Sequence, residues 1–287
     1  MTNARNHRAP RRRTRYPHRR ALAVVLAGIA LAGTALADPR PFREYPGIEY
    51  YDFPLPHDYM NPAEWTLGRL MYPASTYSCR GNMAWGDLSW TTDYPRADRH
   101  IAEMVRRLTA VDARSVEQPV DLDDGDDVFN WPWLYAVEVG TWELTHEQAA
   151  KLREYLLRGG FLMVDDFHGE CEWGIFLESM HRVFPDRLIV DVDPSDSIFH
   201  ALYDIEDLSQ IPGAQFTRSG RTYERRDGIT PHWRGIYDDE GRLMVAITHN
   251  MDLGDAVEHS DTPQYPEPYS ARAMRTFINY IVYAMTH

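Results

Sequence analysis

The stretch THEQAAKLREYLLRGGFLMVDDFH, residues 145–168, decides the fold of this chain. Thr145 followed three positions later by Gln148 forms a capping box, and an apolar stripe at helical spacing continues until a Gly-Gly pair ends the helix. Residues 161–164 are apolar without alternation, which predicts a parallel strand covered on both faces. Ligands of open α/β sheets bind beyond the carboxyl ends of such strands, so the acidic end of this stretch lies where a site is expected.

Strands and helices alternate on both sides of this stretch. This alternation predicts an α/β fold, a three-layer sandwich with a mostly parallel central sheet. Apolar or amphipathic patterns predict further strands over residues 67–71, 116–122, 133–139, 188–192 and 242–248, and helices from residue 96, over 175–183 and at the C-terminus.

Three of these strands, over 67–71, 133–139 and 242–248, are expected to be parallel neighbours of the strand at 161–164 in one sheet. Residues 38–66 show no period and predict an extended N-terminal segment, which leaves 67–287 as a single α/β domain. The polar stretch 209–238 is consistent with a small antiparallel addition whose place the sequence does not give.

The first 37 residues have the composition of a secretory signal peptide. They contain eight arginines and no acidic residue, then an apolar run from Ala21 and a small-residue Ala-Leu-Ala site ending at Ala37. Export to the periplasm with cleavage is the preferred interpretation, and a retained membrane anchor is the competing one; the apolar run is short for a membrane span. The pair Arg19-Arg20 keeps twin-arginine export open beside general secretion. After cleavage we expect no stable membrane span.

The net charge limits the classes of partner that we expect, and the cysteine content permits a disulfide. The chain has 30 basic and 43 acidic residues; losing the eight leader arginines leaves 22 against 43, a net charge of −21. Such a surface repels phosphate backbones, so nucleic acid is not expected as a partner. Cys79 and Cys171 both follow predicted strands at the same edge, and export permits a disulfide between them, with two buried free thiols as the alternative.

The chain resembles a bacterial family of uncharacterised proteins, domain of unknown function forty-one fifty-nine. The Asp-Tyr-Pro motif at 93–95 and the Asp-Asp motif at 165–166 are its most specific elements, and the likeness covers about Tyr50 to His287. The other matching pieces are Arg69-Leu70-Met71-Tyr72, Trp90-Thr91-Thr92, Asp98, residues 152–164, Asp252-Leu253-Gly254-Asp255, Tyr265-Pro266 and residues 279–287.

That family looks related in fold to the class I glutamine amidotransferase-like group, and the resemblance implies an amidotransferase-like sandwich; a flavodoxin-like one is the alternative. In the wider group a catalytic cysteine, where present, follows a central strand in a sharp turn. The corresponding turn, residues 138–141, has no cysteine, so amidotransferase and cysteine-peptidase chemistry are not supported.

Acidic and imidazole side chains follow the predicted strands at one edge of the sheet. Carboxylates suit calcium, magnesium or manganese and imidazole favours zinc, so a divalent metal is a candidate cofactor, although no compact ligand motif occurs. Structural alternatives stay open: Asp93 as a helix cap, and Asp165 or Asp166 as acceptors of backbone amides in a turn. The residues concerned are Asp93, Glu138, Asp165, Asp166, His168, His249 and Asp252.

Within this set, Asp165, Asp166 and His168 are the candidate catalytic residues, because an imidazole beside carboxylates can transfer a proton near neutral pH. Aromatic faces next to carboxylates hold sugars or cations in many proteins, and core packing is the alternative role for them. The candidate ligand-binding residues are Trp90, Asp93, Tyr94, Glu138, His249 and Asp252.

Three functions follow from these features. The leading hypothesis is an exported protein that binds a small polar ligand, a saccharide or a cell-envelope fragment, with or without a metal. The second is a metal- or carboxylate-dependent hydrolase in which Asp165 or Asp166 activates water and His168 transfers a proton. The third is a non-enzymatic envelope assembly protein that binds another protein and whose acidic cluster is structural.

Overall fold

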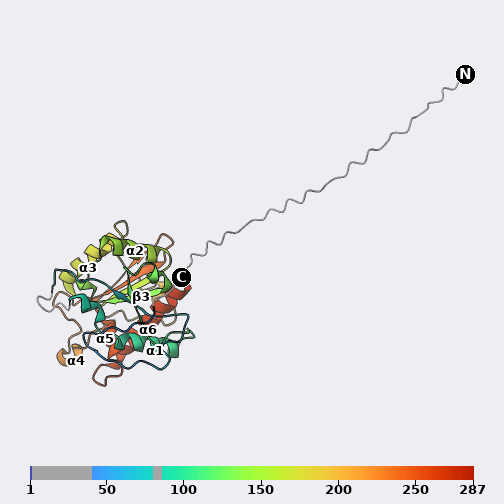
Figure 1. The fold of residues 1–287 in the computed structure, drawn as a ribbon. Coiled ribbons are helices and arrows are strands. Elements are labelled where there is room, and N and C mark those ends of the chain that lie inside the picture. The colour runs from blue at the N-terminus through green and yellow to red at the C-terminus, as the bar shows by residue number, and fades with distance from the viewer. Residues whose placement is uncertain (2–40, 80–85) are drawn as a thin grey trace. The chain divides into compact units, whose positions relative to one another are not determined.

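The computed structural model (Figure 1) describes Met1 and residues 41–79 and 86–287. Within these residues the sheet has seven strands in the order β2-β1-β3-β4-β7-β6-β5. The strands from β2 to β7 in this order are parallel, and β6 and β5 are antiparallel additions at one edge. The strands are β1 Gly68–Met71, β2 Gln118–Asp121, β3 Trp133–Val137, β4 Phe161–Asp165, β5 Val190–Asp191, β6 His232–Tyr237 and β7 Leu243–His249.

The predicted α/β class and the parallel arrangement of the four central strands are confirmed. β1, β3, β4 and β7 are consecutive neighbours in the sheet. The strand expected over 188–192 is shorter than predicted and antiparallel, because β5 has only two residues, both exposed, and pairs with β6. The small antiparallel addition that was expected within residues 209–238 is β6, which pairs with β7 and β5.

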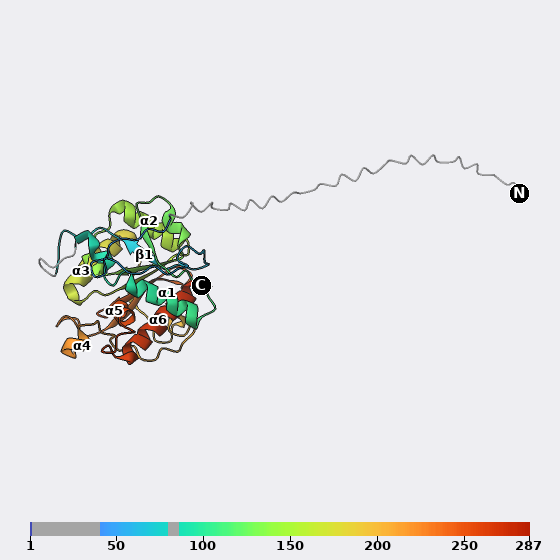
Figure 2. The same cartoon turned by 60° about the horizontal axis from the view of Figure 1, so that its bottom comes forward.

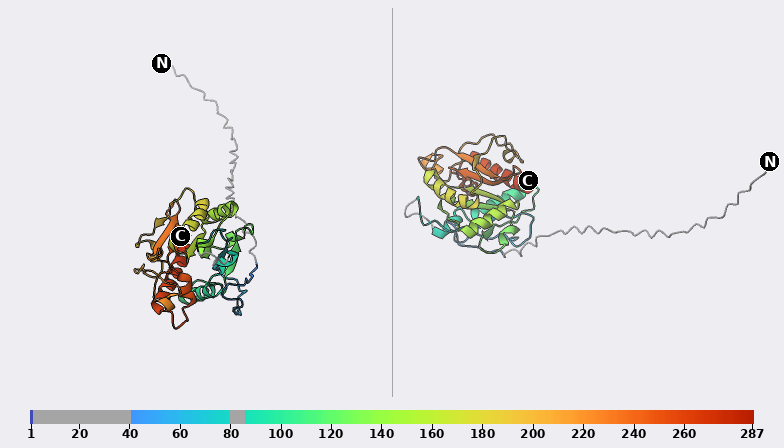
Figure 3. Two further views of the ribbon diagram at one scale, coloured as in Figure 1. Left: turned by 90° about the vertical axis from the view of Figure 1, so that its left-hand side faces the viewer. Right: turned by 90° about the horizontal axis from the view of Figure 1, so that it is seen from above.

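Helices cover both faces of the sheet. Figure 2 shows α2 and α3 on one side of it and α1, α5 and α6 on the other, and Figure 3 shows the same two layers from two further directions. The helices are α1 Arg96–Leu108, α2 His146–Leu157, α3 Gly169–Val183, α4 Phe216–Ser219, α5 Leu253–Glu258 and α6 Glu267–Thr286, with 3-10 turns η2 Gly86–Thr91, η3 Asp127–Asn130, η4 Val139–Thr141 and η5 Ser197–Phe199.

Strand β3 shows how the two hydrophobic cores arise. Its residues are buried on both faces and alternate between the cores: Trp133, Tyr135 and Val137 pack with α1, α5 and α6, whereas Leu134 and Ala136 pack with α2 and α3. A side chain of a strand points to the opposite face from its neighbour, so an unbroken apolar run supplies both cores at once.

The stretch that decides the fold behaves as its sequence predicts. Thr145 and Gln148 make the reciprocal capping box, with the two backbone-to-side-chain bonds each 3.1 Å long. Gly159 then adopts a φ of 106°, which ends α2 and turns the chain into β4. Helix α3 differs from the prediction, since it begins at Gly169 and not at residue 175, and His168 is therefore its N-cap residue.

Cys79 and Cys171 form a disulfide, with their Cα atoms 5.9 Å apart. The predicted approach of the two cysteines is confirmed. The bond ties the connection after β1 to the first turn of α3, two residues after Gly169.

The predicted signal peptide, residues 1–37, lies outside the described residues except for Met1. Among the residues that are described, no helix combines the length and the apolar character that a membrane crossing requires. The boundaries proposed for the N-terminal segment and the single domain stay predictions.

Candidate functional site

Three aspartates from separate parts of the chain meet at the strand-end edge of the sheet. Asp166 follows β4, Asp252 follows β7, and Asp93 lies between η2 and α1. A carboxylate oxygen from each lies within 4.8 Å of the other two, and the residues are only 1 %, 4 % and 2 % exposed in the order 93, 166, 252. We refer to these three residues as the carboxylate triad.

The backbone at this edge is held in an uncommon conformation. Among the described residues, four that are not glycine have positive φ: Asp93 at 61°, Glu138 at 51°, Asp166 at 54° and Asn250 at 63°. Three of them directly follow β3, β4 and β7. Such conformations cost on the order of 1–3 kcal/mol each and cluster at functional sites, so they mark the strand ends as a candidate binding site.

Asp93 keeps its side chain available. Its backbone N–H donates to Oε2 of Glu49 (2.8 Å), and its carbonyl accepts the N–H of Ala97 (2.9 Å). The N-cap of α1 is Pro95, with no side-chain cap bond, so the alternative role of Asp93 as a helix-capping side chain is wrong. Among the described residues Oδ2 of Asp93 has no hydrogen-bond partner.

Burial and repulsion between carboxylates raise the pKa of two members of the triad. Burial, and then neighbouring carboxylates, hold the pKa of Asp93 and of Asp252 well above the ordinary value for aspartate. The same two causes act on Asp255, where burial raises the pKa to about 7 against opposing hydrogen bonds. Shared protons or a bound cation would relieve this repulsion.

The side chain of Asp165 has a different role from that of Asp166. Its Oδ2 accepts the N–H groups of Leu253 (2.7 Å) and Gly254 (2.9 Å), and its Oδ1 accepts the hydroxyl of Thr248 (2.5 Å). Burial raises its pKa to about 7 although these bonds act in the opposite direction. Of the two predicted catalytic aspartates, Asp165 therefore fixes the start of α5, and Asp166 lies in the triad.

His168 lies next to the triad, through Asp166. Its Nε2 is 3.1 Å from Oδ1 of Asp166 and 3.7 Å from Oε2 of Glu224, and its backbone N–H donates to Oε2 of Glu172 (2.6 Å). Burial lowers the pKa of this imidazole, but Glu224 and Asp166 outweigh it, so the net pKa is raised. Its Nδ1 is buried without a partner among the described residues.

His249 lies apart from the triad. Its ring packs against Phe167 and Trp173, at centroid distances of 4.8 and 4.9 Å, and Nε2 is 3.3 Å from the carbonyl oxygen of Gly169. Burial lowers its pKa to about 3, so the ring is neutral at physiological pH. Its ring packs between these aromatic side chains, and no group of possible metal ligands among the described residues joins it to Asp252.

The two aromatic candidates pack beneath the N-terminal segment. Trp90 is 3 % exposed and lies with its ring 5.5 Å from those of Tyr45 and Tyr94, and the hydroxyl of Tyr94 accepts the N–H of Tyr45 (3.2 Å). Trp90 also lines a pocket of about 220 Å³ beside the ends of β1 and β2, together with Asp87 and Asp123. Glu138 is buried at the left-handed turn after β3.

Several acidic residues that the sequence analysis did not single out extend the triad. Glu49 and Glu258 form a further group with Asp93, and the same 4.8 Å limit joins Asp255, Glu258 and His259. Glu49 comes from the extended N-terminal segment and Glu224 from the stretch before β6, where no periodicity marks them. Of these residues, the sequence pointed only to Asp255, through the Asp252-Leu253-Gly254-Asp255 motif.

Two glycines let the chain approach these carboxylates closely. A β-carbon on Gly213 would overlap Oδ2 of Asp252 and lie 2.7 Å from Oδ2 of Asp255 and 2.8 Å from Oε1 of Glu224. A β-carbon on Gly254 would overlap Oδ2 of Asp93. Any larger residue at either position must displace the carboxylates, so the packing depends on glycine there.

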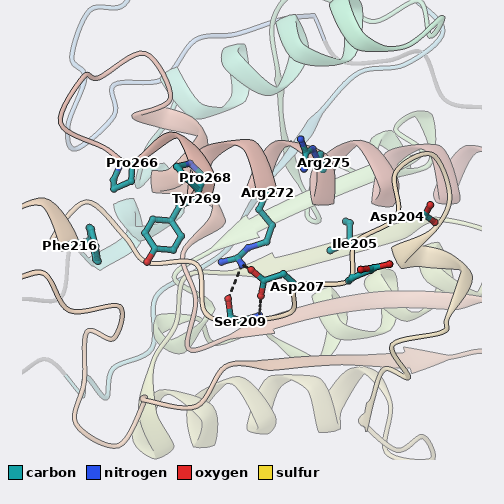
Figure 4. A pocket seen from close by; sticks show the side chains of 11 residues that line it. Asp204, Ile205, Asp207, Ser209, Phe216, Pro266, Pro268, Tyr269, Arg272 and Arg275 are labelled. Atoms are coloured by element: carbon teal, nitrogen blue, oxygen red, sulfur yellow. Dashed lines mark hydrogen bonds and ion pairs between the residues drawn. The ribbon is translucent and has the colours of Figure 1, made fainter.

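A separate pocket, of about 780 Å³, lies at the start of α6 (Figure 4). Tyr269 and Arg272 point into it, and Arg272 binds Asp207 and Ser209 on its opposite wall. None of the candidate residues predicted from the sequence lines this pocket.

A sequence model of the family described as Domain of unknown function (DUF4159) matches residues 80–285. The chain belongs to this family. All three triad residues and His168 lie within the matched range, whereas Glu49 lies before it. No curated protein matches the chain. The implied relation of the family to the amidotransferase-like group stays a prediction.

Proposed function

We propose that this protein binds a divalent cation through the carboxylate triad and, with its help, a small polar ligand such as a saccharide or a cell-envelope fragment. The observation that carries the proposal is Oδ2 of Asp93: it is buried, has no partner among the described residues, and belongs to a carboxylate that meets Asp166 and Asp252 within 4.8 Å. Buried polar atoms are almost always paired, so an orphaned one at such a place favours a missing ligand.

The chemistry of the donors favours a hard cation at the triad. Three carboxylates offer only oxygen, which calcium, magnesium and manganese prefer. Such an ion keeps open coordination positions that water or a ligand's hydroxyl and carboxylate oxygens fill. A polar, oxygen-rich ligand is the class that this arrangement suits.

Export to the periplasm is part of the proposal. The leader composition supports it, and so does the Cys79–Cys171 disulfide, because disulfides persist in oxidising compartments. Partners in that compartment are cell-envelope molecules. The third hypothesis stays an envelope assembly protein that binds another protein and whose acidic cluster is structural.

A thermal-shift experiment tests the cation site. The chelator-treated protein is melted with and without Ca²⁺, Mg²⁺ or Mn²⁺, and binding to the folded state should raise the melting temperature of the wild type. Asp93→Asn should abolish the rise. Asp239→Asn removes the same charge at a side chain that is 84 % exposed and should keep the rise. No response to any of the three cations in the wild type would refute the proposal.

A metal-dependent hydrolase is the second candidate, and the Asp166–His168 pair favours it. In this alternative His168 binds no cation. Asp166 would activate a cation-bound water molecule, and His168, whose pKa is raised, would donate a proton to the leaving group. Cation-dependent turnover of chromogenic phosphate esters or chromogenic glycosides would support it if the turnover disappears in His168→Asn. Binding of the ligand without turnover would exclude hydrolysis and leave ligand binding as the function.

A further inference from the structure

A second group of possible ligands shares Asp166 with the triad. It consists of Asp166, His168 and Glu224, and one donor atom from each lies within 4.8 Å of the others. Nε2 of His168 is 3.1 Å from Asp166 and 3.7 Å from Glu224. Ligand atoms about 2.0–2.2 Å from one metal ion are roughly 3–3.5 Å apart, so these separations are close to those of a bound state.

This group differs from a cluster of carboxylates alone because it contains the imidazole of His168. His168 is 2 % exposed, its Nε2 faces both carboxylates, and its Nδ1 has no partner among the described residues. Metal-bound histidines usually donate their second ring N–H to a nearby acceptor or water, and the buried Nδ1 still has this bond to make. A cation would bind on the Nε2 side of the ring, where the two carboxylates lie, and Nδ1 would keep its N–H for a water molecule or another acceptor.

We infer that the strand-end edge holds two divalent cations bridged by Asp166: one in the triad, and a second held by Asp166, His168 and Glu224. The inference rests on the proposed function for its first cation and adds the second. The all-oxygen position suits calcium, magnesium or manganese, whereas the position with imidazole suits zinc or manganese. Manganese fits both donor sets.

Two neighbouring cations also narrow the ligand class. Ions about 3.5–4 Å apart clamp an anionic oxygen group between them more strongly than a neutral sugar hydroxyl. The preferred ligand is therefore a small molecule that carries a phosphate or carboxylate group. Glu224 comes from the stretch before β6, and Gly213 in the same stretch packs against the carboxylates of Asp252 and Glu224, so this stretch closes one side of the site.

Manganese binding to the full chain tests the inference, with electron paramagnetic resonance as the readout. The wild type should bind two Mn²⁺ ions per chain and show a spin-coupled signal. Glu224→Gln changes a side chain that is 27 % exposed and should bind one ion, without coupling. His168→Asn should behave in the same way, and Asp93→Asn should also bind a single uncoupled ion. Asp239→Asn should keep two coupled ions.

Inorganic phosphate serves as the ligand probe. Added phosphate should change the coupled signal of the wild type and leave the single-ion signal of Glu224→Gln unchanged. If the wild type binds one ion and only Asp93→Asn loses it, the second cation position at Asp166, His168 and Glu224 is overturned and the proposed function stays intact. One ion that is lost only in Glu224→Gln would overturn both the triad site and the bridged pair, and no bound ion in any of the proteins would do the same.

Discussion

Gly254 lies directly against the carboxylate of Asp93: a β-carbon on this glycine would overlap Oδ2 of Asp93 and lie 2.8 Å from the hydroxyl oxygen of Tyr135. Gly254→Ala should therefore push Asp93 out of the triad and remove most of the cation-induced rise in melting temperature. Gly174→Ala is the matched control, because a β-carbon there has open space in the middle of α3. That variant should gain about 0.5–1 kcal/mol of stability and keep the full cation response.

If Gly254→Ala responds to cations as strongly as Gly174→Ala does, Asp93 is not a ligand. The comparison uses chelator-treated proteins at one pH, so that only the position of the added methyl group differs.

Asp165 and Asp93 should respond to substitution in opposite ways. Asp165→Ala leaves the amides of Leu253 and Gly254 without their acceptor and should lower the free energy of unfolding by roughly 2–4 kcal/mol. Asp165→Asn should lose less, because its amide oxygen still accepts both N–H groups while the Thr248 hydroxyl donates to the carbonyl of Val164. Urea unfolding of both variants measures the difference.

Asp93→Asn should be at least as stable as the cation-free wild type. The substitution removes one of several buried like charges and no hydrogen bond to Oδ2 of Asp93. Urea unfolding in the presence of chelator is the measurement. A loss of more than about 1 kcal/mol would mean that the carboxylate stabilises the fold, as the structural role of a cluster predicts.

Acid should destabilise the protein through His249. Its pKa is about 3 in the folded state and near 6.5 when unfolded, so below pH 6.5 the unfolded state gains a proton that the folded state does not bind. Stability supplied by the neutral ring is complete above pH 6.5 and is lost as the pH falls towards 3. Between pH 7 and pH 4.5 the loss is roughly 2–3 kcal/mol.

His249→Phe keeps a ring between Phe167 and Trp173 but cannot be protonated. Between pH 7 and pH 4.5, the free energy of unfolding of this variant should fall by roughly 2–3 kcal/mol less than that of the wild type. Equal losses in the two proteins would show that His249 is protonated at the same pH in the folded and the unfolded state.

The Cys79–Cys171 disulfide should contribute about 2–4 kcal/mol to the stability of the oxidised protein, because it closes a loop of 92 residues in the unfolded chain. A reductant should lower the melting temperature of the wild type. The double variant Cys79→Ala with Cys171→Ala should melt at the lower temperature with or without reductant. A wild-type melting temperature that does not respond to complete reduction would contradict this contribution.

Much of the fold was predictable because its signals are local. The capping box at Thr145, the glycine pair after α2 and the apolar run of β4 each determine their own element, and parallel neighbours follow from alternation. The start of α3 was missed because Gly169 and Gly174 weaken its helical pattern. β6 was missed because its sequence mixes charged with apolar residues. Arg234 of β6 pairs with Asp191 of β5, the two-residue strand at the edge of the sheet.

The site was predictable only in part, because contacts across the chain assemble it. Asp166, Asp252 and His168 could be placed by the rule that strand ends share an edge. Glu49 approaches Asp93 across 44 residues from a segment without a period, and no local pattern announces it. The difference between Asp165, which binds amides, and Asp166, which meets the triad, depends on the turn after β4, where Asp166 takes a left-handed conformation.

Calorimetric titration of Ca²⁺ into the chelator-treated full chain tests the central claim most directly, because calcium favours the all-oxygen triad over the position with imidazole. The account predicts saturable binding in the wild type and in Asp239→Asn, and at least a tenfold weaker affinity in Asp93→Asn. Equal Ca²⁺ affinity of the wild type and Asp93→Asn, or no Ca²⁺ binding by the wild type, would contradict the claim that the carboxylate triad is a cation site.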